Sequence, residues 1–313
     1  MAARAWWRDF QLDGAAVHVR KTGARVPIEP GVVGETLAWL RFHLAVEAER
    51  RAIRSDGPRL WFAPERPRPW YLIWPAVQLS GLRIAESPDE ADLAFVFEDV
   101  TQGRIPAGHG LPIINGRCAD VSKSRVADVF EKVSGRALKL DPESWHGPMV
   151  AKSEANGAHD GRVVHGPLTP QSGMVYQRLI DTAAPDGLVE DLRCPTVGGE
   201  IAAVFLKRRP VAARFANANA EVRELDPGAV FSKEGRSLIR EFCAAFGLDW
   251  GGVDVLRERS SGAIWIVDAN KTDMGPPTAL PLDRKLASAR AIGARLRAYC
   301  ERRLTTAQGA PQP

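Results

Sequence analysis

The chain has 313 residues, which suffices for roughly two domains, and its 45% hydrophobic and 26% charged residues are typical of a globular protein. A formal net charge of +4 with dispersed basic residues is not the footprint of a nucleic-acid-binding protein. No apolar run has the length of a transmembrane helix, and the first residues lack the apolar core of a signal peptide. We therefore expect a cytoplasmic protein without nucleic-acid or membrane partners, whose four distant cysteines are reduced and buried: Cys118, Cys194, Cys243 and Cys300.

The N-terminal third predicts a helix followed by short strands. Residues 34–54 have helical composition, with Leu37, Leu40 and Leu44 at helical spacing. A proline-rich connector follows at 66–70. Apolar segments separated by Gly, Pro and Ser then predict a small α/β domain that ends near residue 116, with strands at 70–74, 82–85, 93–97 and 111–114.

Two helices in the remaining chain have clear start and stop signals. The segment 122–135 places Val126, Val129, Phe130 and Val133 at helical spacing and ends at a glycine. A second helix is predicted from about 233 to 246, before Gly247. Strands are expected at 149–152, 174–180 and 199–206, a last helix at about 283–303, and a disordered tail at 305–313.

Residues 251–277 predict a hairpin with a polar face. The runs VDVL and AIWIVDAN are rich in β-branched and aromatic residues and flank the turn signal Ser260-Ser261-Gly262. If the hairpin is symmetric about Ser261, Asp254 lies opposite Asp268, and Asn270 follows on the same face.

Two opposed carboxylates destabilise a hairpin unless a cation lies between them. Two Asp and one Asn offer only oxygen ligands, which suit Mg²⁺ and, as an alternative, Mn²⁺. The hairpin therefore predicts a metal site formed by Asp254, Asp268 and Asn270, and the competing interpretation is a surface hairpin with solvated acids.

Two lysines upstream of the hairpin suit a phosphate site. Lys152 ends a short apolar strand, directly before a loop that contains Gly157 and Gly161. A lysine on a rigid strand can neutralise phosphate, and a glycine loop lets backbone N–H groups approach phosphate oxygens. Lys123 begins the 122–135 helix. Taken singly, each lysine is more typical of a solvated surface position than of a phosphate site.

The order of these elements resembles that of the ATP-grasp superfamily. Five motifs carry the resemblance, which covers residues 118–280: VSKSRVADVFEKVSG, MVAKSEANGAHDG, VYQRLID, DLRCPTVGGEIAAVFLKRRP, and VDVL with IVDAN. The resemblance implies an α/β (α+β) fold in which two lobes grip ATP, preceded by a small Rossmann-like α/β domain. The implied divisions are an N-terminal region at 1–116, a small lobe at 117–175, a large lobe at 176–304 and the tail at 305–313.

The resemblance also assigns roles by position. Lys123 and Lys152 match the lysines that reach ATP phosphates, and Ser153 to Gly161, with Gly157 between them, match the loop that covers the phosphates. The metal ligands are again Asp254, Asp268 and Asn270. The inter-lobe segment that reads adenine is Gln177, Arg178, Leu179 and Ile180, while Asp181 is either a ribose contact or a plain turn residue.

Basic residues supply the expected catalytic group. Arg193, at the start of the strand pair after the hinge, and Arg208 or Arg209, at its end, match positions that hold phosphate or an anionic substrate, and we favour Arg209. Related ligases carry an arginine two residues before the first metal ligand, but this chain has Gly252 there. Lys271, expected at the mouth of the site, and Arg257 are candidates for the missing cation.

The resemblance implies an ATP- and Mg²⁺-dependent ligase that converts a carboxylate into an acyl phosphate for attack by an amine or similar nucleophile. One alternative is a kinase of the same fold, which needs a base such as His159 or Asp273; another is a nucleotide-binding protein without turnover. The substrate, a small molecule or a peptide, is not specified by any motif. A homodimer is the default expectation for the oligomeric state.

Overall fold

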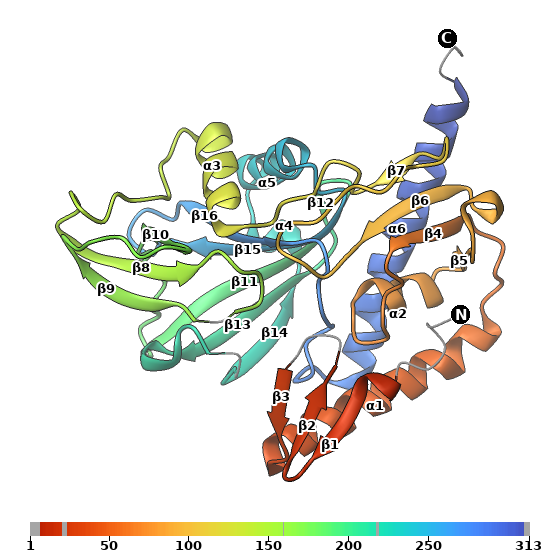
Figure 1. Ribbon diagram of the computed structural model, residues 1–313, viewed down its shortest axis with the longest axis horizontal. Coiled ribbons are helices and arrows are strands. Elements are labelled where there is room, and N and C mark those ends of the chain that lie inside the picture. The colour runs from red at the N-terminus through yellow and green to blue at the C-terminus, as the bar shows by residue number, and fades with distance from the viewer. Residues whose placement is uncertain (1–6, 21–23, 159, 217–218, 310–313) are drawn as a thin grey trace.

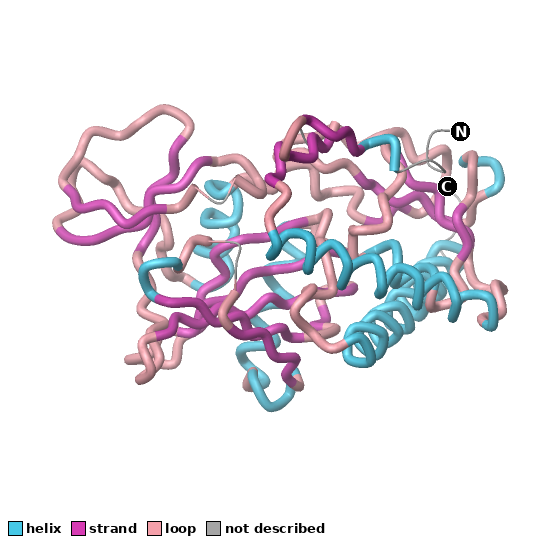
Figure 2. The backbone as a smooth tube through the Cα atoms, turned by 90° about the horizontal axis from the view of Figure 1, so that it is seen from below, coloured by secondary structure: helices cyan, strands magenta, loops and turns pink. Residues whose placement is uncertain are grey.

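The computed structural model describes residues 7–20, 24–158, 160–216 and 219–309. It is a mixed α/β fold with four separate sheets. Figure 1 shows a small antiparallel sheet at one end of the molecule, a large antiparallel sheet in the middle, and a parallel sheet beside a long C-terminal helix at the other end. Figure 2 shows the longer helices gathered at one end of the molecule. Phe42 and Val46 of the first helix pack with Leu286 and Ala289 of the last helix.

The chain begins with a three-stranded antiparallel sheet, order β1-β2-β3, and a helix. The strands are β1 (Phe10–Asp13), β2 (Ala16–Val19) and β3 (Ala24–Pro27). Helix α1 (Pro30–Glu49) starts with a proline, which the first turn tolerates, and continues into η2 (Arg50–Ala52). Phe42 and Val46 are its buried residues, whereas the leucines whose spacing predicts the helix, Leu37, Leu40 and Leu44, are exposed.

A four-stranded parallel sheet, order β5-β4-β6-β7, forms the expected small α/β unit. Its strands are β4 (Arg59–Pro64), β5 (Arg83–Ile84), β6 (Leu93–Phe97) and β7 (Ile113–Ile114), connected by α2 (Ile73–Gln78) and η3 (Pro88–Glu90). The predicted strand at 70–74 is wrong: these residues form a turn and the first turn of α2. Tyr71, Leu72 and Ile73 are all buried, so consecutive positions in this run are apolar. Such a run has no hydrophobic periodicity that would distinguish a helix from a strand.

The small antiparallel sheet, order β10-β8-β9, follows helix α3. The strands are β8 (Gly147–Ser153), β9 (Arg162–Gly166) and β10 (Met174–Arg178). Helix α3 (Lys123–Ser134) lies where the sequence predicts it: the Ser122 side chain accepts a hydrogen bond from Arg125 N, and Gly135 ends the helix with a left-handed φ of 69°.

The large sheet has the order β14-β13-β11-β15-β16, with β12 paired to β11. Its strands are β11 (Leu188–Val197), β12 (Glu200–Ile201), β13 (Val204–Pro210), β14 (Glu221–Leu225), β15 (Trp250–Arg257) and β16 (Ile264–Asn270). Between them lie η4 (Val211–Ala213), α4 (Pro227–Val230) and α5 (Lys233–Phe246). Helix α5 confirms its predicted bounds, with Ser232 as the N-cap and Gly247 in the left-handed conformation after its end.

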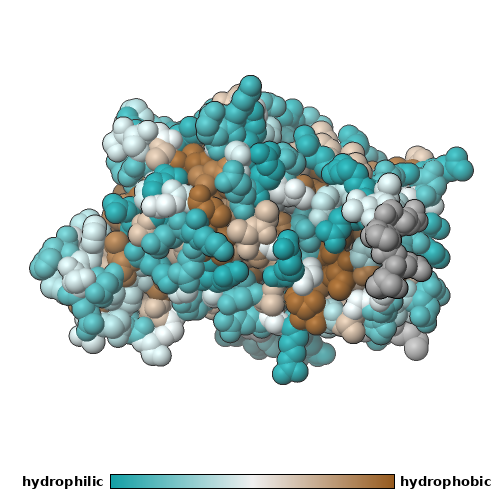
Figure 3. Space-filling view, turned by 90° about the horizontal axis from the view of Figure 1, so that it is seen from above, coloured by the Kyte–Doolittle hydropathy of each residue, from teal (hydrophilic) through white to brown (hydrophobic). Residues whose placement is uncertain are grey.

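The two faces of the large sheet have different partners. On one face, Leu192, Leu206 and Val253 pack in a core that includes Phe130 of α3 and Phe242 of α5. Outside this core, the surface seen from above is mainly hydrophilic, with separate apolar patches (Figure 3). The opposite face contacts the parallel sheet and the C-terminal helix at one end only, so that the rest of this face can carry polar residues.

Helix α6 (Leu282–Gly309) is longer than the sequence predicts. It continues past residue 303 to Gly309, so the disorder predicted for 305–309 is wrong, and residues 310–313 lie outside the described chain. Ile292, Leu296 and Cys300 of α6 pack with Leu60 and Phe95 of the parallel sheet. Within the described ranges, no helix combines the length and the apolar character needed to cross a membrane. All four cysteines are buried free thiols.

Candidate active site

The hairpin of β15 and β16 brings the two predicted carboxylates together. Asp254 pairs with Asp268 and Gly252 pairs with Asn270 in the strand register, which confirms the arrangement predicted from symmetry about Ser261. A bulge follows at once, so that Val255 pairs with Ile266 and the register changes toward the turn. Asp254, Asp268 and Asn270 therefore share the face of the large sheet that α3 and α5 leave uncovered.

Asp254 is neutralised by an arginine from the neighbouring strand. Arg193 is the register partner of Asp254 on β11, and its Nη1 donates to Asp254 Oδ1 at 2.8 Å. Burial alone would raise the pKa of Asp254, but Arg193 and Lys207 outweigh that effect and hold the pKa below its usual range. The sequence predicts Arg193 at the start of this strand, but the residue lies in the middle of β11.

Asp268 is neutralised by a lysine from α3. Lys123 is the first residue of that helix and is 6% exposed, and its Nζ donates to Asp268 Oδ1 at 2.5 Å. Lys152, on β8 of the small sheet, reaches the same place and donates from Nζ to the Val267 carbonyl at 3.0 Å. Burial lowers the pKa of Lys152 to about 8. The two lysines predicted to reach phosphate thus converge on the hairpin of β15 and β16.

The third predicted ligand, Asn270, is held by the loop that follows it. Its Oδ1 accepts hydrogen bonds from Thr272 N at 2.8 Å and from Thr272 Oγ1 at 2.9 Å. Thr272 Oγ1 also lies 2.8 Å from Asp99 Oδ1, beyond the end of β6, so its single proton is shared between the Asn270 and Asp99 oxygens. The placement of Lys271 at the mouth of the site is wrong: this side chain is 1% exposed and donates to the Ala119 carbonyl at 3.4 Å. Alternation along the chain turns residue 271 to the side opposite Asn270.

The side chains present fit a hard divalent cation that also binds nucleotide phosphates. Within the described part of the chain, no three His, Cys, Asp or Glu side chains gather closely enough to hold a metal ion by themselves. The donors at hand are the two carboxylates and one amide oxygen. Mg²⁺ is typically bound by one or two carboxylates with the substrate's phosphates and water, so this donor set fits Mg²⁺ better than a cage formed by protein alone.

The glycine loop is attached to neighbouring segments through its first residues. Glu154 accepts from Ser124 N at 2.9 Å and from the Ser124 hydroxyl, which attaches the loop to the first turn of α3. Asn156 N donates to Thr101 Oγ1 at 2.8 Å. Gly157 has a left-handed φ of 71°, and a Cβ on Gly161 would lie 2.6 Å from the Phe215 ring. His159 lies outside the described residues.

The predicted adenine segment has one buried amide and one turn residue. Gln177 is 2% exposed, and its Nε2 donates to the Lys123 carbonyl at 3.4 Å, whereas Ile180 belongs to the core. Arg178 lies over Trp145 and Trp265, with its guanidinium carbon 5.7 and 5.6 Å from the ring centroids. Asp181 is exposed and accepts from Ala183 N at 3.0 Å, which is the turn role that the sequence analysis left open. Leu179 is partly exposed between these residues.

A second charged group extends from Arg193 along the same face. Asp191 precedes Arg193 by two residues, and Arg209 Nη1 contacts Asp191 Oδ2 at 3.4 Å. Asp191 Oδ1 and Arg209 Nε are buried and have no hydrogen-bond partner among the described residues. Burial, reinforced by the Asp254 carboxylate, raises the pKa of Asp191. Arg208 lies on the other face of β13 and pairs with Asp186, Glu190 and Glu221, which supports the choice of Arg209.

Four residues of this site do not receive their role from the sequence: Glu154, which falls within the predicted glycine loop, Asp191, Lys207, and Asp273, which is predicted only as a base for the kinase alternative. Alternation provides a signal for two of them, because Asp191 shares a face with Arg193, and Lys207 shares one with Arg209. Asp273 accepts from Arg193 Nε at 3.0 Å and from Arg193 Nη2 at 2.6 Å. This contact joins residues 80 positions apart, and no local pattern announces it.

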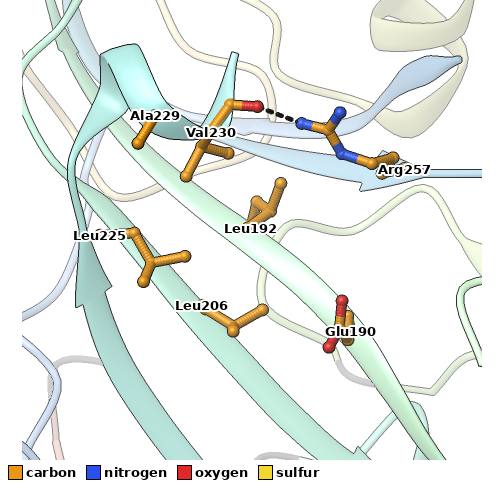
Figure 4. A pocket seen from close by; sticks show the side chains of 7 residues that line it. All are labelled: Glu190, Leu192, Leu206, Leu225, Ala229, Val230 and Arg257. Carbon is orange, nitrogen blue, oxygen red and sulfur yellow. Dashed lines mark hydrogen bonds between the residues drawn. The ribbon is translucent and has the colours of Figure 1, made fainter. Parts of the chain in front are cut away.

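A concave pocket of about 290 Å³ lies on the opposite face of the large sheet (Figure 4). Arg257 lies at one side of the pocket and donates to the Val230 carbonyl. It therefore does not lie beside Gly252, where the sequence suggested it as a candidate for the missing cation. The pocket is lined by Glu190, Leu192, Leu206, Leu225, Ala229, Val230 and Arg257. None of these residues contacts the Asp254–Asp268 pair, so the pocket is not part of the charged site.

No protein-family model matches the sequence, and no curated protein sequence matches it. The solved structures that resemble the chain include ATP-grasp ligases. The ligase PsnB complexed with a minimal precursor is 10% identical, with a TM-score of 0.49 over 78% of this chain and 99% of PsnB. A RimK domain ATP-grasp protein from Sphaerobacter thermophilus is 14% identical, with a TM-score of 0.45 over 78% of this chain and 99% of that chain.

The D-alanine–D-alanine ligase from Bacillus anthracis complexed with ATP is 12% identical, with a TM-score of 0.46 over 80% of this chain and 99% of that chain. Because every TM-score quoted is below 0.5, the functional assignment depends on the geometry of the chain itself.

Proposed function

We propose that the chain is an ATP- and Mg²⁺-dependent ligase of the ATP-grasp type, which activates a substrate carboxylate as an acyl phosphate for attack by an amine or similar nucleophile. The opposition of Asp254 and Asp268 on one hairpin carries this proposal. Each carboxylate is paired with a basic residue from a different element, Arg193 from β11 and Lys123 from α3. Such a cluster suits a polyanion with its cation better than it suits a solvated surface.

The metal, when bound, supplies a positive charge that neutralises the transferred phosphoryl group. Asp254, Asp268 and Asn270 are the residues that would hold it. Lys123 and Lys152 would then turn from the hairpin to the phosphate oxygens, and the backbone amides of residues 153–161 would cover them. Gln177 to Ile180 would line the adenine pocket between the two sheets. No side chain of the protein needs to act as a nucleophile.

We assign to Arg193 the role of the arginine that related ligases carry at the position of Gly252, in place of the candidates Lys271 and Arg257. A Cβ on Gly252 would lie 2.8 Å from Arg193 Nε, so this guanidinium occupies the space beside position 252. We assign Arg193 to the carboxylate and phosphoryl oxygens at the reacting centre, and Arg209 to a more distant anionic group of the substrate. The kinase alternative needs a base near the acceptor, but Asp273 is engaged with Arg193, which favours ligation.

The reaction follows an atom balance that can be tested. A carboxylate oxygen attacks the γ-phosphorus and ADP leaves; the amine then attacks the acyl carbon and loses a proton, and phosphate leaves with one original carboxylate oxygen. We also propose that the substrate is a small molecule or a peptide, and that the protein is a cytoplasmic homodimer. The first test needs no substrate, because it measures the binding of AMPPNP with Mg²⁺ by isothermal titration calorimetry.

We expect wild-type protein to bind AMPPNP in a Mg²⁺-dependent manner, and Asp268→Asn to weaken this binding at least about tenfold, the loss expected for one desolvated ionic contact. Asp13→Asn is the matched control, since the Asp13 side chain is 59% exposed on the N-terminal sheet. Equal binding by wild type and Asp268→Asn would refute the metal hairpin. Once a substrate is found, transfer of ¹⁸O from its carboxylate to phosphate distinguishes ligation from phosphorylation of a hydroxyl group.

A further inference from the structure

Arg193 is held by two carboxylates from opposite sides. Its Nη1 donates to Asp254, while its Nε and Nη2 both donate to the same oxygen, Oδ1, of Asp273. Together these bonds use three different nitrogen atoms of the guanidinium. The side chain of Arg193 is 12% exposed, so little water is available to replace any of these bonds.

Asp273 is itself fixed by the N-terminal unit. The residue is 2% exposed, and its carbonyl accepts from Leu72 N at 2.8 Å. The next residue, Met274, forms an isolated β-bridge with Tyr71. Asp273 Oδ2 is buried without a hydrogen-bond partner in the described part of the chain. The carboxylate therefore has a position set by the backbone, and it directs only one oxygen at the arginine.

Gly252 leaves the space that this pair fills. A Cβ added there would lie 2.3 Å from Asp273 Oδ2, in addition to its contact with Arg193 Nε. Both distances are shorter than any real Cβ contact, and neither partner is free to retreat, because Asp273 is tied to the backbone of residue 72 and Arg193 to two acids. A side chain at position 252 and the Arg193–Asp273 pair exclude each other.

We propose that Asp273 is a positioning residue that keeps Arg193 aimed at the reacting centre when Asp254 turns to another cation; this assignment rests on the proposed function. In the structure, Arg193 Nη1 donates to Asp254 Oδ1. When Asp254 is neutralised by a different cation, Arg193 keeps its two bonds to Asp273, and Nη1 becomes a free donor for an anionic oxygen of the substrate. Without Asp273, the guanidinium would lose both of these bonds and would have no fixed direction.

The test uses inorganic phosphate as the probe, added to the full-length protein that is saturated with ADP and Mg²⁺, with binding followed by titration calorimetry. We expect Asp273→Asn to weaken phosphate binding about tenfold, the effect of misplacing one charge-assisted hydrogen bond. Simple electrostatics predicts the opposite sign, because the substitution removes a negative charge near an anion site. Arg193→Gln should weaken binding by a similar factor, and the double variant should weaken it no further than Arg193→Gln alone.

Gly252→Ala provides a charge-neutral check, since it should displace the pair and weaken phosphate binding without affecting the binding of ADP. Thermal melts verify that each variant is folded, and the isosteric Asp273→Asn variant adds no bulk. Phosphate binding that is unchanged or tighter in Asp273→Asn would overturn the assignment, as would a wild-type complex that binds no phosphate. Failure of wild type to bind ADP with Mg²⁺ would instead refute the proposed function, so the two failures are distinguishable.

Discussion

The side chain of Lys152 is partly buried, and burial disfavours its charged form. Its ammonium group lies among the residues of the hairpin, and burial lowers its pKa to about 8, although Asp268 partly opposes that change. Near neutral pH the group is mainly protonated and can bind phosphate. At higher pH the free protein loses this proton, and binding of a polyanion then requires that the proton be taken up again.

We therefore predict that the affinity for ATP falls as the pH rises through about 8, by up to about tenfold per pH unit, because one proton is linked to binding. Lys152→Arg should abolish this dependence, since the guanidinium stays protonated throughout that range. Calorimetric titrations at pH 7 and pH 9 with both proteins measure the effect. An equal pH dependence in the two proteins would show that Lys152 does not contact the nucleotide.

Single residues also show where prediction from sequence ends. Asp254 and Asp268 could be paired because both lie on one hairpin, where strand alternation and a turn signal determine the partners. The bulge changes the register only between these acids and the turn, so it leaves their pairing intact. Asp273 could not be assigned to Arg193, since their contact depends on how β11 packs beside the loop after β16.

At the scale of elements, helices with capping signals are predictable, and uniformly apolar segments are not. Helices α3 and α5 each have an N-cap serine and a glycine after the last turn, so local chemistry sets both ends. The segment 70–74 has neither signal, and its conformation is set by burial between the parallel sheet and α6. The sequence analysis does not predict strand β4, because its place depends on parallel pairing with β5 and β6, which lie later in the chain.

The two helix-ending glycines offer a matched pair of variants. Gly135→Ala should cost about 1 kcal/mol, the penalty of a left-handed conformation, because nothing lies within 4 Å of the added Cβ. Gly247→Ala should cost more, about 2–4 kcal/mol, because its Cβ would lie 2.8 Å from the backbone of Arg117 as well. Urea unfolding of both variants measures the difference. Equal losses would mean that the Gly247–Arg117 approach is relieved without cost.

At the scale of the whole molecule, Asn115 joins the parallel sheet to the large sheet. It is 0% exposed and lies just after β7 with a φ of 59°. Its Oδ1 accepts from the backbone N–H groups of Asp249 and Trp250, each at 2.9 Å, and its Nδ2 donates to the Trp250 carbonyl at 2.9 Å. These bonds fix the start of β15, the strand that carries Gly252 and Asp254.

We predict that Asn115→Gly lowers the free energy of unfolding by about 3 kcal/mol, because two buried backbone groups and one partly buried backbone group lose their partner. Glycine keeps the left-handed backbone without strain, but it also adds freedom to the unfolded chain, so the side-chain bonds are measured by the difference from a matched glycine variant. His109→Gly is the control, because His109 also has a positive φ, of 49°, but is exposed. Equal unfolding midpoints for the two variants would contradict the role of Asn115 as a connection between the sheets.

The packing of α6 has a consequence for how the chain folds during synthesis. The parallel sheet is completed by residue 114, yet Leu60 and Phe95 share their core with Ile292 and Cys300, which leave the ribosome some 180 residues later. Domains of a nascent chain commonly fold in the order of synthesis. Here the parallel sheet must wait for the last helix to cover it, so its apolar face stays open to water, or to a chaperone, while the residues of the candidate site from Lys123 to Asp273 are being made.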